Sequence, residues 1–140
     1  MTLTYKFNKY RLENGQYVSR PRIPIVLKGT GSIDAFALLD TGADTTVIPE
    51  SIASSIGLDM TGQRDKLYAY RESSEVIPSK VDITFLGKAR RQSIQLQSVP
   101  VLITIGEQSG EIVLGIQKIF DEFDITFKKK QNKIIFKKIQ

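Results

Sequence analysis

Apolar and polar residues alternate along most of the chain in short runs, and turn-forming residues separate these runs. Alternation with a period of two places successive side chains on opposite faces of a strand, so the pattern predicts β-strands. The predicted strands cover residues 22–29, 33–40, 65–70, 75–87, 92–106, 111–115, 123–127 and 133–139. A fold built mainly of β-sheet is therefore expected.

Three polar turns connect the predicted strands in the second half of the chain. Residues 71–74 separate the two arms of a long hairpin, and Gln131 and Asn132 lie at the tip of a closing hairpin. Residues 107–110 form the third turn, after which the strand 111–115 is expected to return along the sheet.

Residues 49–58 form the one segment with a convincing helical pattern. Pro49 stands at a natural first helical position, apolar residues follow at helical spacing, and Gly57 can end the helix. A second short helix is predicted over residues 116–120. The predicted fold class is accordingly all-β, with one or two short helices.

The length of 140 residues suits one domain with a hydrophobic core and is short for two. The sequence shows no internal repeat, low-complexity linker or domain boundary. We therefore expect a single domain over residues 1–140, with residues 123–140 as a C-terminal β-hairpin. Residues 1–20 carry the weakest pattern, and their structure is left open.

The sequence contains no histidine and no cysteine. This excludes Ser-His-Asp and Cys-His nucleophiles, and metal sites built on imidazole or thiolate. Carboxylates, lysines, tyrosines or hydroxyl groups must carry any chemistry, and no cofactor is expected. The N-terminal residues lack an apolar signal segment, so no secretion signal is expected, and no apolar run is near the roughly 18 residues of a membrane span. Since the lack of cysteine fits a reducing compartment, we expect a cytoplasmic protein.

The net charge of +5 is concentrated near the C-terminus, where residues 128–138 contain six lysines. Such a segment can bind nucleic acid or an anionic surface. Lysines also keep the exposed edge of a hairpin from pairing with another strand. The second explanation is favoured, so no nucleic-acid partner is expected.

The segment LLDTGADTTVIP, residues 38–49, places a carboxylate directly after apolar residues. Ionisation of Asp40 at the edge of a core is costly unless the group is paired, hydrogen-bonded or used. Asp-Thr-Gly alone is an ordinary turn sequence. Here, however, it stands between two apolar runs, and a further apolar run closing on glycine, IVLG, follows at residues 112–115.

This ordered pair of motifs resembles the retropepsin-like aspartic protease family, the retroviral-type enzymes and their microbial single-domain relatives. LLDTGADTTVIP is similar to the active-site loop of the family, and IVLG to the apolar segment that packs behind it. Residues 120–136 are similar to the C-terminal hairpin of the microbial members, so the likeness covers residues 22–138. The resemblance implies a retropepsin-like acid protease fold and aspartic endopeptidase activity.

Within the active-site loop, the resemblance implies that Asp40 is the catalytic residue. Thr41 is expected to hydrogen-bond across to a second loop, and Gly42 lets the backbone approach the carboxylate closely. Ala43 continues the loop, and Asp44 is expected to face the substrate backbone or a basic group. The alternative for Asp44 is a loop-stabilising carboxylate that accepts hydrogen bonds from nearby N–H groups.

Peptide hydrolysis of this kind needs two carboxylates that share one proton, because like charges about 3 Å apart do not both ionise. The ionised group takes a proton from water, and the protonated group polarises the scissile carbonyl and helps to protonate the leaving amine. The sequence contains one Asp-Thr-Gly and no Asp-Ser-Gly. The second carboxylate is therefore expected from Asp40 of another copy, in a two-fold homodimer that acts on a polypeptide.

Two features depart from the family pattern. Many relatives carry arginine after the late glycine, where it pairs with the acidic residue of the loop, but Ile116 stands here. The hairpin expected to form the flap over the site has no glycine at its tip. Tyr68, Tyr70 and Arg71 are the candidate flap residues, although packing within the sheet is the favoured role of the two tyrosines.

Two other classes of function are left open. A catalytically silent module on the same fold would bind a peptide or protein without cleaving it. A metal-dependent hydrolase would use Asp40 and Asp44 as hard oxygen ligands. These two residues lack the Asp-x-Asp spacing of magnesium-dependent phosphatases, and no further acidic cluster follows. No metal site is therefore expected.

Overall fold

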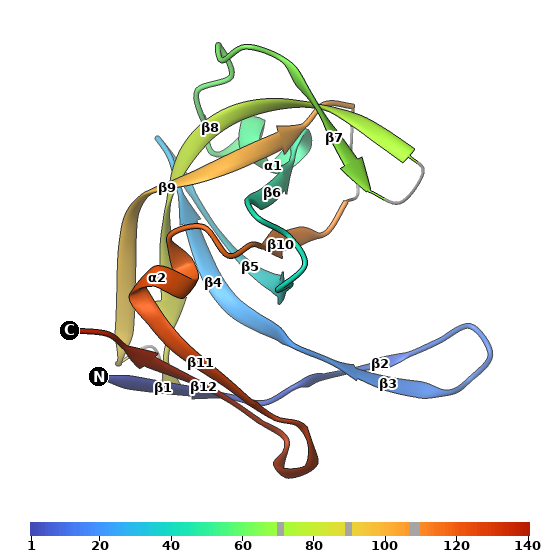
Figure 1. The fold of residues 1–140 in the computed structure, drawn as a ribbon, viewed down its shortest axis with the longest axis vertical. Helices are drawn as coiled ribbons and strands as arrows, with labels where there is room; N and C mark the ends of the chain where they lie inside the picture. The colour runs from blue at the N-terminus through green and yellow to red at the C-terminus, as the bar shows by residue number, and fades with distance from the viewer. Residues whose placement is uncertain (70–71, 89–90, 107–109) are drawn as a thin grey trace.

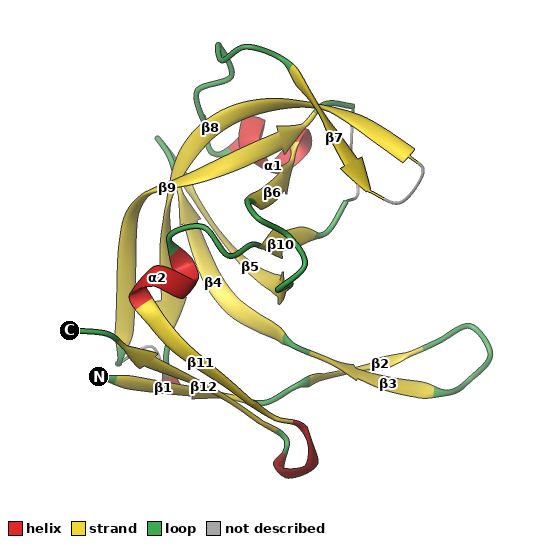
Figure 2. Cartoon of the chain, viewed as in Figure 1, coloured by secondary structure: helices red, strands yellow, loops and turns green. Residues whose placement is uncertain are grey.

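The computed structural model describes residues 1–69, 72–88, 91–106 and 110–140. Strands dominate, as the sequence predicts, and the helices are short (Figure 2). The strands of the main sheet are β4 (Arg22–Lys28), β5 (Ser32–Leu39), β6 (Thr46–Pro49), β7 (Asp65–Ala69), β8 (Glu72–Leu86), β9 (Ser93–Thr104) and β10 (Ile112–Leu114). The other elements are β1 (Thr2–Tyr5), β2 (Asn8–Arg11), β3 (Tyr17–Arg20), α1 (Glu50–Ser55), α2 (Ile119–Glu122), β11 (Phe123–Lys128), the 3-10 turn η2 (Lys129–Gln131) and β12 (Lys133–Lys138).

The main sheet has the strand order β4-β5-β10-β6-β9-β8-β7, and β4 also pairs with β8. The sheet therefore curls into a closed ring, from which β7 extends as the outer arm of a hairpin with β8 (Figure 1). Strand β10 lies parallel to β5, and β6 lies parallel to β9. The loop between β5 and β6 consequently meets the end of β10.

The inside of the ring is the hydrophobic core. Along β4, Ile23, Ile25 and Leu27 are fully buried, and the residues between them are partly exposed. This alternation follows from the pleat of a strand that has one face in the core. Equivalent buried positions on β5, β6, β8, β9 and β10 complete the interior.

A second sheet, of order β1-β12-β11, joins the two ends of the chain and packs against the ring. The ring of Phe85 from β8 lies 5.1 Å from that of Phe123 and 5.5 Å from that of Phe136, between ring centroids. Tyr5 packs edge-on against Phe136 at 5.3 Å. This aromatic cluster fixes the closing hairpin, which the sequence predicts correctly.

Strands β2 and β3 form a separate hairpin that projects from the body (Figure 1). None of its residues is buried. Cation–π contacts stabilise this hairpin instead. The guanidinium groups of Arg20 and Arg22 lie 5.4 and 4.9 Å from the centre of the Tyr10 ring. Weak burial explains why residues 8–20 carry no clear hydrophobic pattern, whereas in β1 Leu3 and Tyr5 are buried.

The predicted helices are present with shifted ends. Helix α1 begins after Pro49, which is its N-cap, and Gly57 follows it with a φ of 68°, a left-handed conformation that favours glycine. The second helix was expected over residues 116–120, but α2 covers Ile119–Glu122. Residues 116 and 117 are used instead for contacts with the loop after β5. No helix in the described ranges is long and apolar enough to cross a membrane.

One strand prediction is wrong in its details. Residues 72–74 were expected in a turn, but they belong to β8, and residues 70 and 71 lie outside the described part of the chain. The strand 111–115 was expected to return along the sheet, and β10 does so: it is antiparallel to β6, which is parallel to β9. Its neighbours are β5 and β6, which the sequence did not identify, because an apolar run predicts a strand but not its partners.

Candidate active site

Asp40 stands at the carboxyl end of β5, at the rim of the ring. Leu39 before it is buried, and Asp40 itself is half-buried. The backbone N–H of Asp40 donates to the carbonyl of Leu114 at 3.0 Å, which continues the ladder between β5 and β10 by one residue. The carboxylate is therefore attached to regular structure and not to a free loop.

The loop after β5 folds back on this carboxylate. Oδ1 of Asp40 accepts a hydrogen bond of 2.8 Å from the N–H of Gly42. The N–H of Ala43 donates to the carbonyl of Asp40 at 3.2 Å and closes the turn. A Cβ atom at residue 42 would lie 3.1 Å from Oδ1, so glycine lets the backbone approach the carboxylate without crowding it.

Residues 115–117 hold the other side of the loop. The N–H of Ile116 donates to the carbonyl of Ala43 at 2.9 Å, and the N–H of Gln117 donates to the carbonyl of Asp44 at 2.8 Å. The hydroxyl of Thr45 also lies 3.4 Å from Oε1 of Gln117. The loop is thus connected by backbone hydrogen bonds to a segment distant in sequence.

Thr46 and Gly115 complete this arrangement, and Thr46 was not among the predicted site residues. The Thr46 side chain is fully buried, and its hydroxyl accepts a hydrogen bond of 3.1 Å from the N–H of Gly115. A Cβ atom at Gly115 would lie 2.5 to 2.8 Å from the backbone of Thr45, so only glycine fits. A polar residue at the start of an apolar run, VIP, was the available signal for Thr46.

The side chains of Thr41 and Asp44 have no partner within the described part of the chain. Both residues are exposed. Within the described residues, the Thr41 hydroxyl makes no hydrogen bond, and the Asp44 carboxylate makes neither a hydrogen bond nor an ion pair. Ile116, which stands where many relatives have arginine, is 38% exposed. The loop-stabilising role considered for the Asp44 carboxylate is therefore not seen here.

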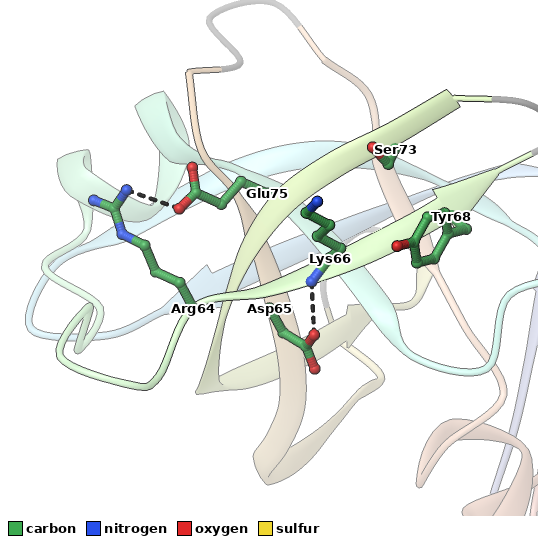
Figure 3. Close-up of a pocket in the computed structure, with 6 residues that line it drawn as sticks. All are labelled: Arg64, Asp65, Lys66, Tyr68, Ser73 and Glu75. Carbon is green, nitrogen blue, oxygen red and sulfur yellow. Dashed lines mark hydrogen bonds and ion pairs between the residues drawn. The ribbon is translucent and has the colours of Figure 1, made fainter.

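The hairpin of β7 and β8 carries its own pocket (Figure 3). Side chains of Arg64, Asp65, Lys66, Tyr68, Ser73 and Glu75 line it. An ion pair joins Arg64 to Glu75 at 2.9 Å. No residue of the loop 40–45 lines this pocket, so the structure does not place Tyr68 and Asp40 in one cavity.

Of the three flap candidates, the structure describes Tyr68. Its side chain is 73% exposed, so packing within the sheet is the wrong explanation for this tyrosine. The ring stands on the edge strand β7, where one face of the sheet is open to solvent. Tyr70 and Arg71 lie outside the described residues.

In the described part of the chain, no group of three or more Asp and Glu side chains is placed to hold a metal ion. Asp40 and Asp44 therefore form no such cluster with a third acidic side chain in these ranges.

A family model described as aspartyl protease matches residues 24–117, more than half of the chain, including the Asp40 loop and the Gly115 segment. The chain therefore belongs to the aspartyl protease family. No curated protein matches its sequence.

Solved structures show that the fold is the retropepsin-like one, as the motifs predicted. The chain is similar to a retropepsin-like aspartic protease from Rickettsia conorii, with a TM-score of 0.60 and 14% identity over 97% of this chain and 92% of the other. It is also similar to the EIAV protease in complex with the inhibitor HBY-793, with a TM-score of 0.50 and 22% identity over 80% of this chain and 91% of that one.

Proposed function

We propose that this protein is an aspartic endopeptidase in which two copies of Asp40, one from each chain of a homodimer, activate the attacking water. One observation carries the proposal. The chain has a single Asp-Thr-Gly loop, and that loop holds a half-exposed carboxylate at the rim of the ring by backbone hydrogen bonds. The aspartyl protease family and the retropepsin-like fold support the reaction class.

In the proposed dimer the two carboxylates share one proton. The ionised Asp40 removes a proton from the water, which attacks the scissile carbonyl of a bound polypeptide. The protonated Asp40 donates a hydrogen bond to the carbonyl oxygen and later helps to protonate the leaving amine. The Gly42 N–H bonded to Oδ1 orients each carboxylate, so little reorganisation is needed when charge moves.

The remaining residues of the loop have roles that agree with two-fold symmetry. Thr41 is exposed beside Asp40 and would donate its hydroxyl proton to the loop of the second chain. Asp44 is exposed and unpaired in the described residues, so it is available to the substrate backbone. The hairpin of β7 and β8 would cover the bound chain, with Tyr68 as a contact residue.

Mixing wild-type protein with the Asp40→Asn variant tests the shared site. Asparagine keeps the size of the side chain, so fold and dimer are retained, but it can neither serve as the general base nor share the proton. With free subunit exchange at equal amounts, about one quarter of the dimers are fully wild type, and activity per wild-type chain falls to about half. Peptide cleavage is measured across mixing ratios after exchange has been verified.

The two mechanisms predict different curves. A quadratic dependence of activity on the wild-type fraction supports a site shared by two chains, whereas a linear dependence contradicts it. Activity should also be strongest on the acid side and fall when both carboxylates have lost their protons. A wild-type protein that binds an unfolded substrate without cleaving it at any pH would instead favour the catalytically silent module.

A further inference from the structure

A cavity of about 780 Å³ lies away from the Asp40 loop, between four segments that are distant in sequence. The segments are the end of β1 with the link to β2, the start of β4, the end of β8, and the turn of the C-terminal hairpin. None of its lining residues belongs to the loop 40–45 or to the pocket on the β7–β8 hairpin. The proposed peptidase function therefore leaves this cavity without a role.

Positive charge gathers in this cavity. Lys6, Arg22, Lys88 and Lys133 line it, one from each segment, and no Asp or Glu is among the described lining residues. Arg22 is paired with Glu111, with 2.5 Å between Nε and Oε1. The three lysines form no ion pair within the described part of the chain. All three lysines are exposed around the cavity, and their positive charge attracts an anion to it.

Neutral hydrogen-bond donors accompany the lysines. The hydroxyl of Tyr5 is buried and has no hydrogen-bond partner among the described residues, and burial raises the pKa of this phenol, so it remains a donor. Oδ1 of Asn132 is already occupied, since it accepts the N–H of Phe7 at 3.1 Å, which leaves its NH₂ group free to donate. A cavity with ammonium, amide and hydroxyl donors and no carboxylate suits the oxygens of a phosphate group.

The cavity continues into a groove of about 310 Å³ whose lining is apolar except for Asp34. The two share Pro24, Leu86 and Gly87 as lining residues, and the groove extends to Phe36. Phe36 is 51% exposed, an unusual environment for a large aromatic side chain on a strand of the ring. An apolar or aromatic group attached to the anion would cover the aromatic ring of Phe36.

We propose that the two cavities together form a binding site for a small organic phosphate. Its phosphate lies among Lys6, Lys88 and Lys133, and its apolar or aromatic body lies along Pro24 and Leu86 toward Phe36. Charge complementarity selects the phosphate, and the apolar groove selects a substituted phosphate over the free ion. The site is independent of the peptidase activity proposed above.

Calorimetric titration of the purified protein tests this site with three probes, inorganic pyrophosphate, ADP and hexyl phosphate. At least one of the two organic phosphates should bind more tightly than pyrophosphate. Tighter binding of ADP identifies an aromatic body, and tighter binding of hexyl phosphate identifies an alkyl body. Absence of binding by all three probes up to the millimolar range would overturn the proposal.

Paired variants locate the bound phosphate. The double variant Lys6→Gln/Lys133→Gln should weaken binding of every probe about tenfold or more, since two charge-assisted contacts are lost. Lys129→Gln/Lys130→Gln is the matched control, because these exposed lysines belong to the same hairpin and do not line the cavity. An equal loss of affinity in the two double variants would show that net charge alone drives binding, and it would contradict a defined site.

Two single variants assign the rest of the site. Phe36→Ala should weaken binding of the preferred organic phosphate several-fold and leave pyrophosphate unchanged. Tyr5→Phe should weaken binding of all three probes, because it removes only the hydroxyl donor. Unchanged affinities in both variants would contradict the placement of the ligand.

Discussion

The Asp40 loop and the β7–β8 hairpin differ in how the rest of the chain holds them. Backbone hydrogen bonds from residues 114–117 hold the loop, and Gly115 packs against it without space for a side chain. Among the described strands, the outer strand of the hairpin pairs only with β8, and the ion pair of Arg64 and Glu75 is largely exposed. The part proposed for chemistry is tightly held, whereas the part proposed to cover substrate is loosely held.

This difference has a physical basis in the proposed reaction. A carboxylate that exchanges a proton with water must keep its position to within a fraction of an ångström. A strand that covers a bound polypeptide must instead move to admit it. Backbone hydrogen bonds and close packing serve the first need, and an exposed edge strand serves the second.

The largest effect on stability is expected from Gly115→Ala. A Cβ atom there would lie 2.5 Å from the carbonyl carbon of Thr45, and these backbone atoms of Thr45 cannot yield easily. We expect a loss of about 3 kcal/mol in the free energy of unfolding, together with a marked loss of peptide cleavage. Urea denaturation measures the first and a peptide assay the second.

Gly31→Ala is the matched control for this variant. Its nearest neighbour would lie 3.7 Å away, an ordinary contact, and we expect a change within about 0.5 kcal/mol. Equal stability of the two variants would show that the loop is not as closely packed as described.

Thr46→Val removes one buried hydroxyl and keeps the shape of the side chain. The N–H of Gly115 then loses its acceptor in a buried setting, which costs about 1–2 kcal/mol of stability. Thr126→Val, at an exposed position on β11, is the control and should change stability little. Unfolding of both variants is compared by urea denaturation, and an unaltered midpoint for Thr46→Val would contradict the role of this hydrogen bond.

Arg64→Gln tests the hairpin side of the comparison. The ion pair with Glu75 has side chains that are 61% and 48% exposed, so its loss should cost less than about 1 kcal/mol. High salt should reduce the difference between variant and wild type further. A larger cost, insensitive to salt, would mean that the hairpin is held more firmly than its exposure indicates.

Tyr68→Ala should have the smallest effect on stability and a selective effect on function. The ring is 73% exposed, so unfolding should change by less than about 0.5 kcal/mol. If the ring covers substrate, KM for a peptide rises while the fold is unchanged. Steady-state kinetics with a long and a short peptide measure this change. Unchanged KM and kcat with both peptides would show that Tyr68 does not contact the substrate.

Local pattern was enough to predict elements that have one buried face. The alternation in β4 and the closing hairpin around Gln131 and Asn132 are found where the sequence placed them. For β10 the apolar run predicted the strand correctly but could not identify β5 and β6 as its neighbours. The prediction failed at the start of α2, which begins three residues later than expected because the N–H groups of Ile116 and Gln117 bond to the Asp40 loop.

The sequence alone determined which chemistry is available to this protein and where most strands of the main sheet and the closing hairpin lie, but not β1, β2, β3 or β6. The lack of histidine and cysteine, together with one Asp-Thr-Gly, led to the prediction that Asp40 is the catalytic residue and that a second copy of the chain supplies its partner. Only the tertiary structure brought Gly115 against Thr45, buried the hydroxyl of Thr46, and gathered Lys6, Lys88 and Lys133 in one cavity. The reason is physical: hydrophobic periodicity acts over a few residues, whereas these contacts depend on the path of the whole chain.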